Sequence, residues 1–201
     1  MKRIGAVILA AGMSRRLGFN KFRLTLDGVS VIHRAVAPFF DAPVDHVIVV
    51  SGFDREVIDR DLTDLDVQIV YNADYQEGMG ASVRAVAPFL KDMDDVLFHL
   101  GDKPLISVDM IRELLSVGES SPGKIILPLY RGERGHPVLV PMSLCLDEMG
   151  AAGGDKGLRD IIEKHSVDVI CIEGDESVVL DIDTEESIML LRKKGIRVEK
   201  N

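Results

Sequence analysis

Three groups of charged residues in this sequence stand directly after apolar segments, where they could act on a ligand. The first is cationic, because Arg15, Arg16 and Lys21 follow the apolar residues 4–10 in a loop that also contains glycines. Backbone N–H groups of such a loop can cradle phosphates, and its positive charges suit a triphosphate. The alternative is a solvated loop whose basic residues only favour solubility. The loop matches neither the G-x-G-x-x-G nor the G-x-x-x-x-G-K-[ST] pattern, so its spacing alone identifies no nucleotide-binding motif.

The second group is a carboxylate at the end of the apolar segment 95–101. A charge at Asp102 needs compensation, either by a cation or by a helix N-terminus. Ser107 is better placed than Asp102 to cap the helix that we expect to follow. Asp102 is therefore predicted to bind a cation.

The third group is a pair of carboxylates near the C-terminal end of the chain. Asp181 and Asp183 alternate with apolar residues in 177–183, so in a strand both would point to one face. Two carboxylates on one face favour a divalent cation, for which oxygen is the usual ligand. A competing explanation for part of this motif is that Thr184 and the two glutamates after it start a helix.

Segments with the pattern of buried strands alternate along the chain with segments of helical period. This order implies right-handed crossovers and a mostly parallel sheet, and an "EGD" turn at 173–175 predicts that the last two strands are antiparallel. We therefore expect a Rossmann-like α/β fold, a single three-layer αβα domain over 1–201 with a mixed sheet. The expected strands are 4–10, 45–51, 67–71, 95–101, 124–130, 136–141, 167–173 and 177–183, and the expected helices are 30–40, 55–62, 81–90, 107–117, 156–165 and 184–195.

Composition narrows the class of protein. The 201 residues carry 24 Lys+Arg against 33 Asp+Glu, a formal charge of -9 that argues against binding nucleic acid through phosphates. No segment approaches a transmembrane span, and the N-terminal apolar run is too short for a signal peptide and reads as a first strand. Cys145 and Cys171 lie in apolar segments and are expected to be reduced core thiols. A cytoplasmic enzyme without nucleic-acid or membrane partners is the expectation.

One long motif carries a family resemblance. "LAAGMSRRLGFNK" (9–21) resembles the L-A-A-G-x-S-x-R-M-G-x-x-K signature of the MobA-like nucleotidyltransferases, which act on sugar phosphates and cofactors, with Leu17 in place of the usual Met. "YNADYQEGMGASVRAV" (71–86) is similar to a segment of one branch, the molybdenum cofactor cytidylyltransferases and the accessory proteins of molybdenum hydroxylases. Further matches, in order, are "GDKP" (101–104), "GHPVLV" (135–140), "GGDKGLRDI" (153–161) and "LDIDTEES" (180–187).

The resemblance implies a reaction and a set of sites. The reaction is Mg²⁺-dependent transfer of a nucleoside monophosphate from CTP to the phosphate of a molybdopterin-type cofactor, with release of pyrophosphate. Arg16, Lys21 and Asp102 are implied as catalytic. Asp183 is implied as a direct metal ligand with Asp102, and Asp181 as a residue that supports these ligands without touching the ion, or as an alternative ligand. The implied nucleotide-binding residues are Leu9, Ala10, Ala11, Gly12, Ser14, Arg15, Arg16, Lys21, Gly80, Ser82 and Gly101, and the implied acceptor-binding residues are Lys103, His136, Lys156 and Arg159.

Several alternatives stay open at the level of sequence. Ala11, in "LAAG" rather than "LAGG", favours CTP over GTP, but guanylyl transfer, or transfer to a sugar or alcohol phosphate, fits the same motifs. Ser82 could be only a helix cap. His136 is a weaker candidate for a general base than for positioning the acceptor, because an ionised phosphate needs none. Lys103 replaces a commonly uncharged residue, so it could contact a phosphate or repel the metal.

An alternative function, which involves no catalysis, is that of a carrier protein that transfers the cofactor to a molybdenum hydroxylase client. The joint presence of Arg16, Lys21, Asp102 and Asp183 favours an enzyme.

Overall fold

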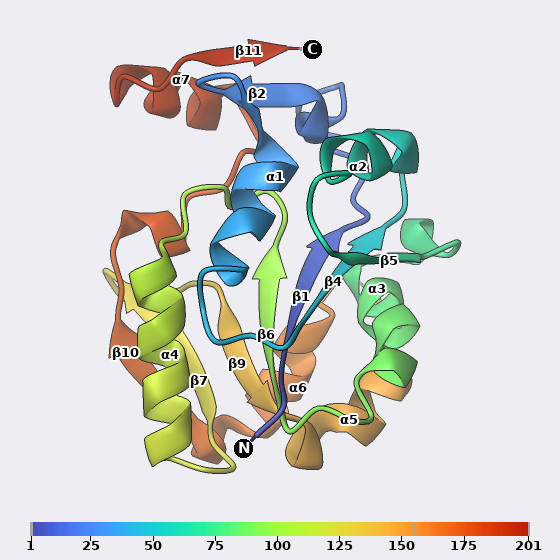
Figure 1. Ribbon diagram of the computed structural model, residues 1–201, viewed down its shortest axis with the longest axis vertical. Helices are drawn as coiled ribbons and strands as arrows, with labels where there is room; N and C mark the ends of the chain where they lie inside the picture. The colour runs from blue at the N-terminus through green and yellow to red at the C-terminus, as the bar shows by residue number, and fades with distance from the viewer. Residues whose placement is uncertain (1, 155, 201) are drawn as a thin grey trace.

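The centre of the computed structural model, which describes residues 2–154 and 156–200, is a mixed sheet with the strand order β10-β7-β9-β6-β1-β4-β5 (Figure 1). Within this path the neighbours are parallel except at β9, which runs antiparallel to both β6 and β7. The short β8 pairs antiparallel with β7. The strands are β1 Ile4–Ala10, β4 His46–Ser51, β5 Gln68–Tyr71, β6 Asp95–Leu100, β7 Ile125–Tyr130, β8 Glu133–Arg134, β9 Val138–Pro141 and β10 Val169–Glu173.

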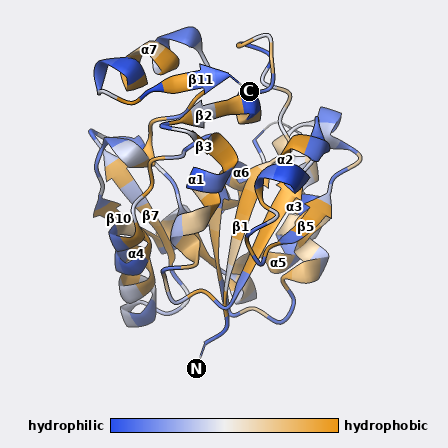
Figure 2. Cartoon of the chain, turned by 45° about the horizontal axis from the view of Figure 1, so that its top comes forward, coloured by the Kyte–Doolittle hydropathy of each residue, from blue (hydrophilic) through white to orange (hydrophobic). Residues whose placement is uncertain are grey.

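Helices cover both faces of the sheet, because its strands are apolar on both sides. Within β1, Ala6 and Ile8 pack into one hydrophobic cluster and Val7 packs into the other. The first cluster includes residues of α1 Val31–Val36, α2 Arg55–Asp61, α4 Val108–Ser120 and α7 Glu185–Lys193. The second includes residues of α3 Met79–Val86, α5 Met142–Gly150 and α6 Leu158–Lys164. Figure 2 shows the largely apolar strands between helices of mixed hydropathy, and the two clusters on opposite faces confirm the expected three-layer α/β architecture.

A second, three-stranded sheet was not expected from the sequence. It has the order β11-β2-β3 and joins β2 Leu24–Leu26 and β3 Val29–Ser30 to β11 Val198–Lys200. Val198 pairs with Leu26 and Lys200 with Leu24, so residues far apart in the chain lie side by side at the top of Figure 1. These strands are too short to give a readable alternation of apolar and polar residues.

The expected strand 177–183 is wrong. A 3₁₀ turn covers Glu176–Val178, and the chain then runs irregularly into α7. Leu180 and Ile182 are buried, so the apolar alternation is real. Their N–H groups, however, donate to the carbonyl oxygens of Glu176 and Asp102 rather than to a neighbouring strand. The expected antiparallel pair with β10 is therefore absent from the described residues, and the mixed character of the sheet comes from β9 instead.

The remaining differences concern helices and one thiol. Residues 37–39 and 87–89 form 3₁₀ turns that end the expected helices 30–40 and 81–90, and α5 was not predicted. Cys145 is buried as expected, but Cys171 is exposed on β10. None of the helices that the structure describes is both long enough and apolar enough to cross a bilayer.

Candidate active site

A cleft of about 420 Å³ opens beyond the carboxyl ends of β1 and β6, where ligands bind in open α/β sheets. The loop after β1 forms one wall, and the 3₁₀ turn η3 (Tyr75–Glu77) and the start of α3 form the other. Its lining residues are Leu9, Ala10, Ala11, Gly12, Met13, Ser14, Arg15, Arg16, Lys21, Phe22, Tyr75, Gln76, Gly78, Met79, Ser82, Leu100, Asp102 and Asp183.

The loop after β1 is folded back on itself by Ser14. This residue has a φ of 51°, in the left-handed region that non-glycine residues seldom occupy. Its hydroxyl oxygen accepts a hydrogen bond of 3.1 Å from the N–H of Lys21, and its carbonyl accepts one from the N–H of Leu17. The backbone of Lys21 is thereby fixed at the start of the 3₁₀ turn η1 (Lys21–Arg23), and its side chain reaches the carboxylates.

Lys21 is held between two carboxylates that come from distant parts of the chain. Its ammonium donates to Asp102 Oδ2 and, at 3.0 Å, to Asp183 Oδ1. The second oxygen of Asp183 lies 2.8 Å from the guanidinium of Arg16. Lys21 is only 7% exposed. Burial alone would lower the pKa of Lys21, but the two carboxylates outweigh it and raise that pKa above its ordinary value.

The other side-chain oxygen of Asp102 supports the expected cation site. Asp102 Oδ1 is buried and has no hydrogen-bond partner among the described residues. Two carboxylates meet at one ammonium, and one of them has an oxygen without a hydrogen-bond partner. Together they can supply the oxygen ligands that a divalent cation prefers. Asp102 and Asp183 therefore fit such an ion. Asp181 lies outside the cleft, and the described residues contain no cluster of three His, Cys, Asp or Glu side chains suited to a metal.

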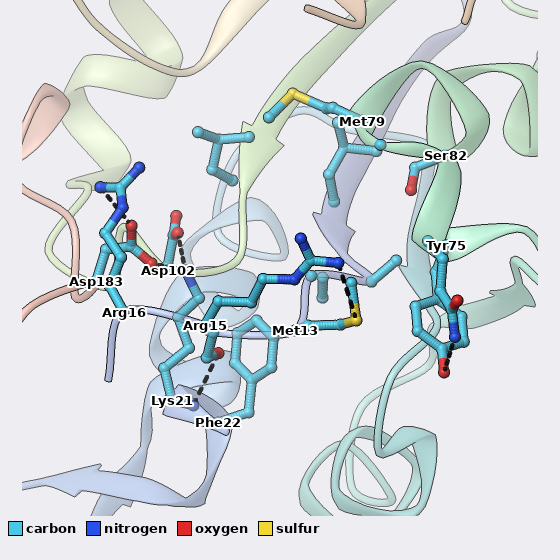
Figure 3. Close-up of a pocket in the computed structure, with 18 residues that line it drawn as sticks. Met13, Arg15, Arg16, Lys21, Phe22, Tyr75, Met79, Ser82, Asp102 and Asp183 are labelled. Carbon is cyan, nitrogen blue, oxygen red and sulfur yellow. Dashed lines mark hydrogen bonds and ion pairs between the residues drawn. The ribbon is translucent and has the colours of Figure 1, made fainter. Parts of the chain in front are cut away.

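The opposite end of the cleft is polar but carries no ion-paired carboxylate. There the Asn72 side-chain N–H donates to the hydroxyl oxygen of Ser82 at 3.1 Å. Because α3 begins at Met79 after Gly78, Ser82 lies inside the helix and the alternative that it is only a cap is wrong. In Figure 3 Asp102, Asp183, Arg16 and Lys21 gather on one side, Tyr75 and Ser82 on the other, and Arg15 between them.

Arg15 is a cation of the cleft that makes no ion pair within residues 2–154 and 156–200. Its guanidinium contacts only the sulfur of Met13, at 4.0 Å. An anionic ligand could therefore bind Arg15 without first breaking a salt bridge.

A second cleft of about 720 Å³ adjoins the first. It is lined by the expected acceptor residues His136, Lys156 and Arg159, and Met79 lines both clefts. The two clefts meet where α3 packs on the loop before α6. There the N–H of Gly80 donates to the carbonyl of Gly154 at 2.8 Å, and a Cβ on Gly80 would lie 2.4 Å from the backbone of Gly153.

The structure places four other predicted residues outside the lining of both clefts. Gly80 packs on Gly153, and Gly101 donates its N–H to Leu9 O at 3.0 Å and packs on Ile32, Ala10 and Phe22. These two glycines shape the walls through close packing. The ammonium of Lys103 is buried and donates to the carbonyl of Val179. Burial raises the pKa of Asp181, and the carboxylate of Asp102 adds to that shift.

Sequence reasoning missed some residues that line the first cleft. Three of them lie in the segment 71–86: Tyr75, Gln76 and Met79. The residue types at these positions did not indicate that they face a cleft. Tyr75 also packs on Phe53, with ring centroids 6.3 Å apart, so the wall is partly aromatic. Asn72, which orients Ser82, stands at the Asn of an N-x₅-G-x₃-S pattern that the segment 71–86 shares with the molybdenum cofactor branch, and that pattern was the available signal.

Two histidines are held neutral: His136, which lines the second cleft, and the buried His99. Burial lowers the pKa of His99 to about 3 and that of His136 to about 4. His99 Nε2 pairs with the carbonyl of Lys103 at 3.0 Å. His136 Nδ1 pairs with the carbonyl of Phe98 at 3.3 Å, and because a carbonyl only accepts, Nδ1 must be the protonated nitrogen. The other ring nitrogen of His136 is then an acceptor.

The chain matches a known protein family over most of its length. Residues 6–169 match the model of the MobA-like NTP transferase domain, which covers more than half of the chain. The chain belongs to this family. It is a nucleotidyltransferase, and both clefts and the signature loop fall largely within the matched residues.

Relatives of this nucleotidyltransferase cover nearly its whole length. It is 28% identical over 198 residues to the molybdenum cofactor cytidylyltransferase of Escherichia coli (strain K12), covering 96% of this chain and 98% of that one. The crystal structure of Rv0371c from Mycobacterium tuberculosis H37Rv superposes with a TM-score of 0.83 at 26% identity, covering 96% and 98% of the two chains. A structure of Rv0371c in complex with manganese gives a TM-score of 0.77 at 23% identity, covering 95% of this chain and 98% of that one.

The first prediction concerns the ion pairs of the nucleotidyltransferase. Lys21→Met leaves two partly buried carboxylates facing each other, so the metal-free variant should lose about 3 kcal/mol of unfolding free energy. Added Mn²⁺ should raise its melting temperature more than that of the wild type, because the ion no longer competes with an ammonium. Thermal melts with and without Mn²⁺ measure both effects. Arg15→Gln is the matched control, since Arg15 contacts neither carboxylate, and equal melts for Lys21→Met and wild type would contradict the prediction.

The second prediction concerns pH. The two buried histidines take up protons near pH 6.5 when unfolded but only near 3 and 4 when folded, so the unfolded state binds more protons between these values. Stability present above pH 6.5 should therefore be lost on acidification, by up to about 1.4 kcal/mol per pH unit for each histidine. Denaturant unfolding between pH 7 and 4.5 measures the slope. His136→Gln should flatten it, and an unchanged slope would show that His136 is not the group responsible.

Proposed function

We propose that this nucleotidyltransferase moves a cytidine monophosphate unit from CTP to the phosphate of a molybdopterin-type cofactor and releases pyrophosphate, with Mg²⁺ as the activating ion. The observation that carries this proposal is the pairing of two clefts that share Met79. One contains the signature loop and the Asp102–Lys21–Asp183 cluster, and the other contains His136, Lys156 and Arg159. A transfer between two substrates needs two such sites side by side.

The first cleft has the polarity that a nucleoside triphosphate requires. Its charged end, with Arg15, Arg16 and Lys21, would bind the phosphates, while Ser82 and the backbone of 9–12 at the other end would contact the ribose and base. Arg15 is free of ion pairs in the described structure, so it would engage the triphosphate first. Arg16 would engage it by leaving Asp183. These cations would also stabilise the charge that develops on the departing pyrophosphate.

Asp102 and Asp183 would hold the divalent cation, because they are the carboxylates that meet in the cleft and Asp102 Oδ1 has no hydrogen-bond partner in the part of the chain that the structure describes. When bound, the ion supplies positive charge that polarises phosphate oxygens. Of the proposed ligands, Asp181 would act only indirectly. The manganese complex of Rv0371c supports a divalent ion in this fold, and the choice of Mg²⁺ is part of the proposal.

The second cleft would position the acceptor. An ionised phosphate oxygen of the acceptor forms a bond to the α-phosphorus of CTP as the bond from that phosphorus to the bridging oxygen breaks, and pyrophosphate leaves. No proton has to be removed from the attacking oxygen, which agrees with a neutral, hydrogen-bonded His136 that orients rather than accepts a proton. Lys156 and Arg159 are exposed on that cleft and would attract the acceptor's phosphate.

The choice of substrates rests on the relative from Escherichia coli, which is named as a molybdenum cofactor cytidylyltransferase, and on Ala11 in "LAAG". We also propose that residues 1–201 form a single domain and that the protein is cytoplasmic. A molybdenum hydroxylase is the proposed client that receives the product.

The third prediction tests the reaction and the metal ligand together. Pyrophosphate release is measured with each of the four ribonucleotides at saturating Mg²⁺, with and without molybdenum-loaded pterin phosphate. Turnover should require CTP and the pterin, and Asp102→Asn should lower it by about a hundredfold or more, as when a charge-stabilising group is lost.

The matched control is Asp59→Asn, which alters a carboxylate of α2 outside both clefts and should retain turnover. Wild-type rates in Asp102→Asn would remove that residue from the site. A wild type that releases no pyrophosphate from any nucleotide would instead favour the non-catalytic carrier.

The fourth prediction tests the acceptor cleft. Arg159→Gln should raise the KM for the pterin phosphate about tenfold, the cost of one charged hydrogen bond, and leave the KM for CTP unchanged. The matched control is Arg55→Gln on α2, because Arg55 makes the same kind of i,i+4 pair with Asp59 that Arg159 makes with Glu163. A rise in the KM for CTP alone would place Arg159 at the wrong substrate.

A further inference from the structure

Asp183 reaches the cleft on a segment that belongs to neither a strand nor a helix. Between β10 and α7 the chain makes one 3₁₀ turn and then runs irregularly for six residues, 179–184. Because no ladder of strand hydrogen bonds fixes this segment, its position depends on the burial of Leu180 and Ile182 and on individual hydrogen bonds. That position sets the separation of Asp183 from Asp102, and so the geometry of the proposed metal site.

Backbone hydrogen bonds hold the segment at its two ends. At the start, the N–H of His136 donates to the carbonyl of Val178 at 2.9 Å. At the far end, the N–H of Ile182 donates to the carbonyl of Asp102 at 2.9 Å, and the N–H of Asp183 donates to the hydroxyl of Ser187 at 3.2 Å. The carbonyl of Val179 lies between these anchors.

The partner of that carbonyl is the ammonium of Lys103. Lys103 is 6% exposed, and it lines neither cleft. Its own backbone is fixed on both sides, because its N–H donates to the carbonyl of Leu100 and its carbonyl accepts from the ring of His99. A side chain anchored next to Asp102 therefore fastens the segment that carries Asp183.

We propose that Lys103 is a positioning residue, which holds Asp183 at its distance from Asp102 by binding the carbonyl of Val179, and that it does not contact the acceptor. This inference rests on the proposed function for the identity of the metal site. The buried ammonium of Lys103 supplies the hydrogen bond that the carbonyl of Val179 would otherwise lack, because this segment has no strand neighbour. The nearby carboxylate of Asp181 offsets the positive charge of Lys103.

The direction in which Mn²⁺ affinity changes distinguishes a positioning role for Lys103 from repulsion of the metal and from contact with the acceptor. Lys103→Met keeps the length of the apolar stem and removes the ammonium. Loss of positioning should weaken Mn²⁺ binding in the absence of nucleotide by about tenfold, the usual effect of removing a group that orients a metal ligand. A cation that merely repels the metal would have the opposite effect, because its removal would tighten binding. An acceptor contact would leave Mn²⁺ affinity unchanged and raise the KM for the pterin phosphate.

The experiment is titration of the whole, nucleotide-free protein with Mn²⁺ followed by electron paramagnetic resonance, together with hydrogen exchange of peptides that cover 174–184. We expect weaker Mn²⁺ binding and faster exchange confined to that segment in Lys103→Met, and substantial recovery of both in Lys103→Arg, which restores a charged donor. Lys124→Met is the matched control, because Lys124 pairs with Asp168 away from both clefts. Should Lys103→Met not fold, Lys103→Gln provides the same comparison with a polar but shorter side chain.

Tighter Mn²⁺ binding, or unchanged binding with a raised KM for the acceptor, would overturn the inference. If the wild type binds no Mn²⁺, the metal part of the proposed function fails, and the exchange data decide the inference by themselves. Faster exchange of 174–184 would then support it, and unchanged exchange would overturn it.

Discussion

The arrangement of this active site depends on one ammonium group between two carboxylates. Lys21 stands 81 residues from Asp102 and 162 residues from Asp183 in sequence, and its side chain joins the loop after β1, the end of β6 and the segment before α7. Each of these charges would be costly to bury alone, and together they compensate one another. The cluster therefore gives the charged end of the cleft a definite shape before any substrate arrives, and the oxygen of Asp102 that has no partner among the described residues marks where further positive charge can be accepted.

The same constraint divides the cations of the cleft into two kinds. Lys21 and Arg16 are already paired with carboxylates, so a triphosphate or a divalent ion must exchange partners with them. Arg15 has no such pair among the described residues and is open to the ligand from the start. In the proposed function, binding of nucleotide and metal would therefore redistribute existing ion pairs, which would conserve charge within a partly buried site and limit the cost of desolvation.

The amino-acid sequence is sufficient to predict the central sheet and most of the charged end of the cleft. The strands 4–10, 45–51 and 95–101 have long apolar runs, and the family resemblance of the motif at 9–21 indicates that the loop after β1 lines the site. The sequence is insufficient where position depends on contacts between distant segments. The alternation of Leu180 and Ile182 is the pattern of a strand, yet their N–H groups bond to Glu176 and Asp102, so the argument that Asp181 and Asp183 share a strand face fails although Asp183 reaches the site. Likewise, nothing local to Lys21 indicates that its partners are carboxylates rather than phosphates alone, and Cys171 is exposed because β10 lies at an edge of the sheet.

The small sheet has a consequence for how the protein is made. β2 begins directly after the turn that carries Lys21, and its neighbour β11 is formed by residues 198–200. While a ribosome is still adding the residues after α6, most of the main sheet has already been synthesised, but neither Asp183 nor β11 is yet available to the phosphate loop. Such nascent chains would contain the loop after β1 and Asp102 but not Asp183, so the charged end of the cleft is completed only after residues 183–200 have emerged. Because these contacts join segments that are far apart in the sequence, their formation is expected to be among the slowest steps of folding.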